Sequence, residues 1–166
     1  LSLGRLSDPQ LSPDGKTILY GVSYTSIEEN RSCRNLFIVN ADGTSPRQLT
    51  KDGKSISCAR WIDGGKAIAY IQGGQIWKAT TRGLSGDNPK LVKRTKLGDV
   101  PNGVGEFKIS PDETKIMYVS YIHSDVKTPK DTDPKLDKAR AYVAEDLMYR
   151  HWDHWVTELP HTFVAD

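Results

Sequence analysis

Histidine and aspartate lie close together in the segment "HWDH", which contains His151, Asp153 and His154. Both residue types are common metal ligands. On a helix, His151 and His154 would share a face, whereas on a strand only His151 and Asp153 would point the same way. We favour a strand here and therefore predict no metal site.

The neighbours of this segment fit a packing role. We expect Trp152 and Trp155 to pack between sheets or to line a cavity, and Arg150 and Asp153 to pair near the surface.

No phosphate-binding loop, Rossmann turn or cysteine metal knuckle occurs in the sequence, so no cofactor is expected. Two further residues, Cys33 and Cys58, either pair in an oxidising compartment or remain two buried thiols.

Composition excludes several classes of partner. The chain has 166 residues, 37% hydrophobic and 27% charged, which suits a globular protein with a real core. Its net charge of +2 is too small to indicate nucleic-acid binding, and we interpret the basic segment Lys90–Lys96 as a solvated strand edge. No apolar run approaches the roughly 20 residues that span a bilayer, so no membrane partner is predicted.

A repeated motif dominates the sequence. "SPDGKTILY" ends at Tyr20, "IDGGKAIAY" at Tyr70 and "SPDETKIMY" at Tyr118, at intervals of 50 and 48 residues. Each copy begins with a turn, to which serine, proline, aspartate and glycine are suited, and continues into an alternating apolar strand. In the first copy Ile18 points to the opposite face from Leu19.

Each copy also has neighbouring strands. "SISCARW" and "VGEFKIS" precede the turn, while "NLFIVN" and "GQIWKAT" follow the strand. Four strands in a period near 50 residues are typical of a β-propeller blade. We therefore predict an all-β fold of about three four-stranded blades, at about 8–50, 56–95 and 104–166. A β-sandwich with similar hairpins is the alternative.

The third blade contains an insertion. The polar stretch "HSDVKTPKDTDPKLDKAR" does not resemble a strand, and Asp133-Pro134 suits the start of a short helix. We predict a loop and short helix at about 123–146, after which "YRHWDHWV" and "HTFVAD" complete the blade.

Three blades are too few to close a propeller, which ordinarily has four to eight. Closure matters because it removes exposed strand edges. Two explanations remain open: the chain is one piece of a longer protein, which we favour, or several copies complete a ring as a homo-oligomer.

The residues of the repeat and its surroundings resemble a known family. "LSLGRLSDPQLSPDGKTILY", "MYRHWDHWV" and "HTFVAD" are similar to the N-terminal propeller of the prolyl oligopeptidase family, in its bacterial dipeptidyl-peptidase and acylaminoacyl-peptidase branch. The turn alone is shared with TolB-like propellers. Its combination with "SDPQ" and "YRHWDHW" is more specific.

The resemblance implies that the propeller gates and helps to bind peptide substrates, while a C-terminal α/β-hydrolase domain cleaves them. Such a domain carries its serine in a Gly-x-Ser-x-Gly turn. This sequence has no such turn, because Gly83-Leu84-Ser85-Gly86 has the wrong spacing. We therefore expect no catalytic residue in this chain and no hydrolysis by it alone.

The resemblance also suggests substrate-binding residues. In the dipeptidyl-peptidase branch, acidic side chains of a propeller insertion hold the free amino terminus of the substrate. Glu145 and Asp146 are the candidates here, with Arg150 and Asp153 beside them. The alternative is a solvated acidic face on a short helix.

A second functional hypothesis remains open at this point. A TolB-like propeller without enzymatic activity would bind a protein or peptide partner instead. The resemblance to bacterial relatives implies a periplasmic or secreted location, with the signal peptide absent from this sequence.

Overall fold

The computed structural model describes residues 3–123, 131, 133–136, 138, 150–151, 154–155 and 158–166, with only the backbone at 150–151 and 154–155. Its regular structure is almost entirely β-strand, arranged in antiparallel sheets. Two short 3₁₀ turns are also described, η1 (Asp63–Gly65) and η2 (Pro134–Leu136), and Asp131 has a helical backbone. The all-β prediction is therefore confirmed.

Two sheets have four strands each, connected in sequence order. We call them the first and second blades. The first consists of β1 (Arg5–Leu11), β2 (Thr17–Ser26), β3 (Arg31–Asn40) and β4 (Arg47–Gln48). The second consists of β5 (Ile56–Ile62), β6 (Ala67–Gln72), β7 (Gln75–Arg82) and β8 (Lys90–Lys96).

The third blade differs from the prediction. Among the described residues it has three strands in the order β13-β10-β9, not four. Its middle strand is hydrogen-bonded on one side to the strand before it and on the other to the end of the chain, so that Tyr118 lies opposite both Phe107 and Phe163. The strands are β9 (Glu106–Ile109), β10 (Ile116–His123) and β13 (Glu158–Ala165).

The prediction that "YRHWDHWV" is a strand of this blade is wrong. Its described residues form a separate two-stranded sheet of β11 (Arg150–His151) and β12 (His154–Trp155). His151 lies opposite His154 across this small sheet, on a different strand. The strand that pairs with β10 in the blade is instead β13, which carries "HTFVA". Of the predicted insertion at about 123–146, residues 124–130 and most of 132–146 lie outside the described residues.

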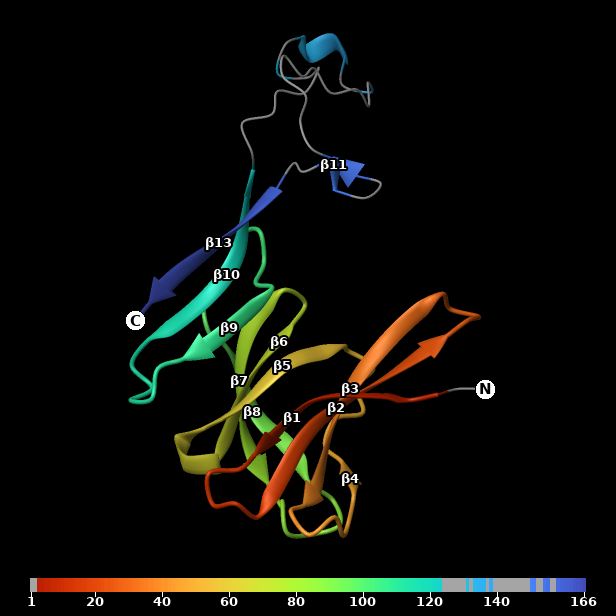
Figure 1. The fold of residues 1–166 in the computed structure, drawn as a ribbon, viewed down its shortest axis with the longest axis vertical. Coiled ribbons are helices and arrows are strands. Elements are labelled where there is room, and N and C mark those ends of the chain that lie inside the picture. The colour runs from red at the N-terminus through yellow and green to blue at the C-terminus, as the bar shows by residue number, and fades with distance from the viewer. Residues whose placement is uncertain are drawn as a thin grey trace.

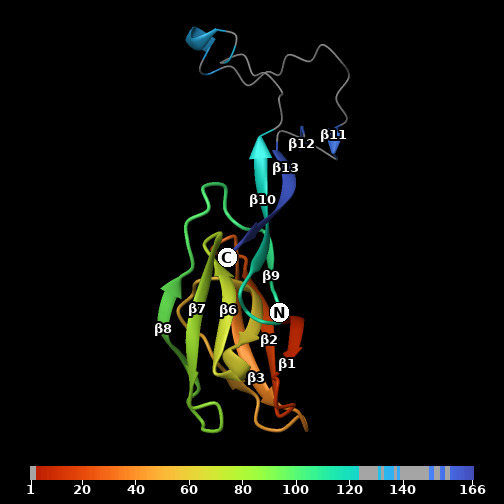
Figure 2. The same ribbon diagram turned by 90° about the vertical axis from the view of Figure 1, so that its left-hand side faces the viewer.

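The three blades lie side by side, with the second blade in the middle (Figure 1). Figure 2 shows β10 and β13 extending beyond the ends of the other two blades. One cluster of buried side chains lies between the first and second blades and another between the second and third. The β6 strand serves both clusters: Ile68 and Tyr70 pack towards the first blade, and Ala67, Ala69 and Ile71 towards the third.

The repeated turn is built by the same hydrogen bonds in the first and third blades. The Ser12 hydroxyl donates to Asp14 Oδ1 at 2.6 Å, as Ser110 does to Asp112 at 2.6 Å. The same serine oxygens accept the N–H of Thr17 and Lys115, both at 2.9 Å. These local bonds hold the turn before each second strand.

Glu113 links the third blade to the second. It has a φ of 57°, at the position where the first blade has Gly15 with a φ of 71°. That backbone conformation costs a non-glycine residue roughly 1–2 kcal/mol. The cost is offset by its carboxylate, whose two oxygens accept the backbone N–H of Asp63 in the second blade at 2.9 and 3.0 Å.

The turn aspartates make folding sensitive to acid. Hydrogen bonds from Ser12 and from the Lys16 N–H hold the Asp14 pKa below its usual 3.8, and Ser110 and Thr114 do the same for Asp112. A carboxyl whose pKa is lower in the folded protein stabilises the fold while it is charged. This contribution is complete above the unfolded pKa and is lost as the pH falls through the folded pKa.

We therefore predict that Asp14→Asn/Asp112→Asn lowers the melting temperature at pH 7. The double variant should also lose less stability than the wild type between about pH 5 and pH 2, because the carboxylates at positions 14 and 112 are no longer there to protonate. Melting curves followed by circular dichroism across that range measure both effects. Parallel pH profiles for the two proteins would contradict the assignment.

Candidate functional site

Most of the substrate-binding residues predicted from the sequence lie outside the described residues. Glu145, Asp146 and Asp153 are in this group, so their role stays a prediction. The backbone of Arg150 is described: it begins β11 and lies opposite Trp155 of β12. The predicted substrate-binding segment therefore reaches into the small sheet that follows the insertion in sequence.

The loop that contains Ser85 has a structural role. The Gly86 N–H donates to the Gly83 carbonyl at 3.1 Å, which closes a turn. Arg47 of the first blade donates to the carbonyls of Leu84 at 2.6 Å and Gly86 at 2.8 Å. These contacts fix the loop against the first blade. None of them places a catalytic partner beside the Ser85 side chain.

A polar cluster lies between the first two blades, where β1 approaches β5. Each of these strands has a bulge at the corresponding place, between Ser7 and Gln10 in β1 and between Ser57 and Arg60 in β5. The bulged residues have left-handed backbones, with φ of 53° at Asp8 and 51° at Cys58. A bulge bends a strand and redirects its side chains.

At the first bulge Asp8 meets a cation of the second blade. Its Oδ2 lies 2.7 Å from Arg60 Nη1, and both side chains are about three-quarters buried, with exposed fractions of 26% and 27%. Gln10 supports the pair by donating to Asp8 Oδ1 at 3.1 Å. The Gln10 carbonyl also accepts the indole N–H of Trp61 at 3.1 Å. The first strands of two blades are thus joined by directional polar contacts.

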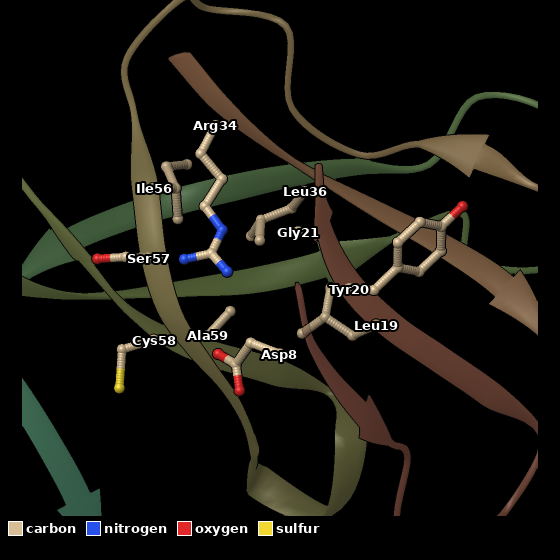
Figure 3. Close-up of a pocket in the computed structure, with 10 residues that line it drawn as sticks. All are labelled: Asp8, Leu19, Tyr20, Gly21, Arg34, Leu36, Ile56, Ser57, Cys58 and Ala59. Carbon is tan, nitrogen blue, oxygen red and sulfur yellow. The ribbon is translucent and has the colours of Figure 1, made fainter. Parts of the chain in front are cut away.

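Arg34 reaches into the same space from β3. Its guanidinium donates to the Ser7 hydroxyl, and its Nε is buried without a hydrogen-bond partner among the described residues. Figure 3 shows the guanidinium among Gly21, Ser57 and Asp8, which line one small cavity. A β-carbon on Gly21 would lie 2.4 Å from Arg34 Nε, so glycine leaves the room that the arginine occupies.

The cavity is too small to serve as a ligand site. Its lining side chains leave no space for a water molecule. We therefore assign this cluster to the joint between blades. Sequence analysis did not single out Asp8, Arg34 or Arg60. Asp8 belongs to the "SDPQ" segment that carried the family resemblance, but no local pattern pairs it with an arginine 52 residues away.

A second ion pair connects the segment between the first and second blades with the outer strand of the second blade. Asp52 lies in the connection from β4 to β5 and forms an ion pair with Arg94 of β8. Burial acts to raise the Asp52 pKa, but the hydrogen bond and positive charge of Arg94 outweigh it and hold the pKa below 3.8. The contact therefore holds the connecting segment against β8 while Asp52 is charged.

The described part of the chain holds no group of three or more histidine, cysteine, aspartate or glutamate side chains placed to bind a metal. Within it, no helix is long and apolar enough to cross a membrane. Cys33 and Cys58 are both free thiols, so the disulfide alternative is not adopted, and Cys58 donates to the Phe107 carbonyl at 3.6 Å.

Comparison with curated proteins gives full-length matches to this chain, although no family model matches it. The dipeptidyl-peptidases 5 of Porphyromonas endodontalis and Porphyromonas gingivalis are each 37% identical to it over 168 residues. Those matches cover 99% and 100% of this chain, which spans only 23% and 24% of the two relatives.

Solved structures show the same fold. The acylaminoacyl peptidase of Pyrococcus horikoshii superposes with a TM-score of 0.66 at 20% identity, covering 99% of this chain and 23% of that one. An acylaminoacyl peptidase in complex with Z-Gly-Gly-Phe-chloromethyl ketone gives a TM-score of 0.63 at 17% identity, covering 98% and 23%. At these identities the likeness concerns the fold alone.

The joint between the blades leads to a prediction for Gly21→Ala. The added methyl group displaces Arg34 from its place beside Ser7, and overpacking of this kind costs about 1–3 kcal/mol of unfolding free energy. In Gly21→Ala/Arg34→Ala the clash is absent, so the alanine at position 21 should cost much less in that background. Urea denaturation of the four proteins in this cycle measures the difference.

Gly86→Ala is the matched control. The nearest atom to its added β-carbon lies at 3.7 Å, which is an ordinary contact. Its stability should therefore stay within about 0.5 kcal/mol of the wild type. Equal costs for Gly21→Ala in the presence and absence of the Arg34 side chain would refute the proposed clash.

Proposed function

Because the chain is a β-propeller segment of a prolyl oligopeptidase-family peptidase, we propose that it gates and helps to bind the substrate of a dipeptidyl-peptidase. Bond cleavage would then take place on an α/β-hydrolase domain elsewhere in the same protein. The substrate class is a peptide with a free amino terminus. The observation that carries the proposal is the 37% identity to two dipeptidyl-peptidases 5 along the whole chain.

In this proposal the blades serve as the scaffold that carries the substrate-binding residues. A cluster of buried side chains fills each joint between neighbouring blades, and the small cavity beside Arg34 leaves no space for a water molecule. A rigid scaffold that carries a long insertion is a common way to place binding residues. The insertion between β10 and β13 is the longest segment here between two adjacent strands of one blade. We therefore place the substrate contacts on it.

We propose Glu145 and Asp146 as the carboxylates that bind the substrate ammonium, with Arg150 and Asp153 nearby. A charged amine removed from water needs charged hydrogen-bond acceptors, and two acceptors fix its position relative to the bond that is cut. The proposal follows from the place of this acidic pair in the insertion of a dipeptidyl-peptidase-like propeller.

In the full-length enzyme, Glu145→Gln/Asp146→Asn should raise KM for free-amine dipeptide substrates by about 10- to 100-fold, as expected for loss of charge-assisted hydrogen bonds. Substrates with an acetylated amino terminus bring no ammonium, so their kcat/KM should change little. Steady-state kinetics with both substrate types separates loss of amine binding from general damage.

Glu28→Gln/Glu29→Gln is the matched control, because it also removes two adjacent carboxylates, from the exposed turn between β2 and β3. Its kinetics should equal those of the wild type. An unchanged KM for the Glu145/Asp146 variant would reject the assignment, as would an equal effect on both substrate types.

The division of labour has its own test. The isolated 166-residue chain should hydrolyse no dipeptide substrate, because its sequence contains no Gly-x-Ser-x-Gly turn. Turnover that a serine-directed phosphonate inhibits would contradict this. A periplasmic or secreted location stays part of the proposal, and fractionation of the source cells tests it.

A further inference from the structure

Two histidines lie opposite each other in the small sheet of β11 and β12 (Figure 2). His151 ends β11, His154 begins β12, and the register pairs them directly. Residues paired in this way belong to the same face of a sheet, with β-carbons about 4.5–5.5 Å apart. The prediction of no metal site assumed that both histidines belong to one strand, where they would occupy opposite faces. The structure removes that objection.

The spacing of the pair suits chelation of a metal ion. Zinc binds histidine nitrogen at about 2.0–2.1 Å, so two ligands of a tetrahedral ion lie about 3.4 Å apart. An imidazole ring extends beyond its β-carbon and rotates about two side-chain torsions, so β-carbons about 5 Å apart allow two rings to reach one ion. His151 and His154 can therefore supply two nitrogen ligands to the same ion.

The small sheet also needs a further source of stability. Each strand has two residues, and among the described residues the sheet pairs with no other strand. An isolated two-stranded sheet is at best marginally stable in water. Trp152 and Asp153, which separate the two histidines in the sequence, are not the Asn-Gly or other glycine-containing pair that short hairpin loops favour. An ion bound by both strands supplies a cross-link where backbone hydrogen bonds are few.

We propose that His151 and His154 bind one divalent transition-metal ion, of the class of Zn²⁺, Ni²⁺ and Cu²⁺, across the small sheet. Imidazole nitrogen suits these ions, whereas Mg²⁺ and Ca²⁺ prefer oxygen ligands. Two protein ligands leave further coordination positions to water. The proposal rests on the register of the sheet and is independent of the proposed peptidase function.

The number of ligands sets the expected affinity. A structural zinc site uses four protein ligands, and two of them supply about half of its binding free energy. This corresponds to a dissociation constant on the order of 1–100 µM. A Zn²⁺ concentration of about 500 µM therefore fills the site in most molecules.

Modification by diethyl pyrocarbonate tests the site in the full-length protein. The reagent acylates imidazole nitrogen that holds no metal, and mass spectrometry reads each histidine separately. Zn²⁺ at about 500 µM should slow the modification of His151 and His154 by at least about fivefold, as this occupancy requires. Mg²⁺ at the same concentration should leave both rates unchanged. His123 and His161, which are exposed on β10 and β13, are internal controls whose rates should not respond to Zn²⁺.

Single variants show whether the two histidines hold one ion together. In His151→Asn, His154 should lose its protection by Zn²⁺, and in His154→Asn, His151 should lose it, because a single imidazole binds the ion far more weakly than a pair. His161→Asn is the matched control and should retain the protection of both. Equal modification of His151 and His154 with and without Zn²⁺ overturns the proposal, and so does protection of one histidine that persists after loss of the other.

The bound ion should also stabilise the small sheet. Binding to the closed sheet lowers the population of the open form in proportion to occupancy, so amide hydrogen exchange in residues 150–155 should slow by at least about fivefold with Zn²⁺. The same comparison in His154→Asn should show no change. Exchange in the wild type that does not respond to Zn²⁺ would show that no ion joins the two strands.

Discussion

Both faces of each blade are apolar, and each face has to be covered by another sheet. In the second blade this condition is met on both sides, and the residues of β6 from Ala67 to Ile71 are all buried. The strand is accordingly a continuous apolar run, as in sheets covered on both faces. The outer blades meet the condition on one side only, which is why Leu11 and Val164 remain exposed.

Apolar packing brings the blades together, but polar contacts fix how they sit. Burial of apolar surface has little directionality, whereas an ion pair or a hydrogen bond to a backbone N–H has a preferred geometry. Asp8 with Arg60 joins the first two blades, and Glu113 with the Asp63 N–H joins the second and third. Each outer blade is therefore held against the second blade by apolar burial together with at least one directional polar contact.

The contrast between blades and insertion also explains which predictions the structure could test. The repeat could be predicted from the sequence because the hydrogen bonds of its turns join residues close together in the chain. Ser12 and Asp14 are two residues apart, and so are Ser110 and Asp112. The pairing of β10 with β13 was missed because those strands are separated by the whole insertion. Alternation of residue types shows that a segment suits a strand but does not identify its partner. The contact of Arg34 with Gly21 could not be predicted either, because it joins residues of two different strands.

The sequence by itself determined the class of fold, the period of the blades, the turns and the absence of a serine-nucleophile turn, because each depends on residues close together along the chain. Tertiary structure alone decided that "HW" at 154–155 pairs within a separate small sheet, that Asp8 meets Arg60, and which apolar faces remain uncovered. Those outcomes depend on which distant strands become neighbours, and that is fixed only when the faces of whole sheets compete for burial.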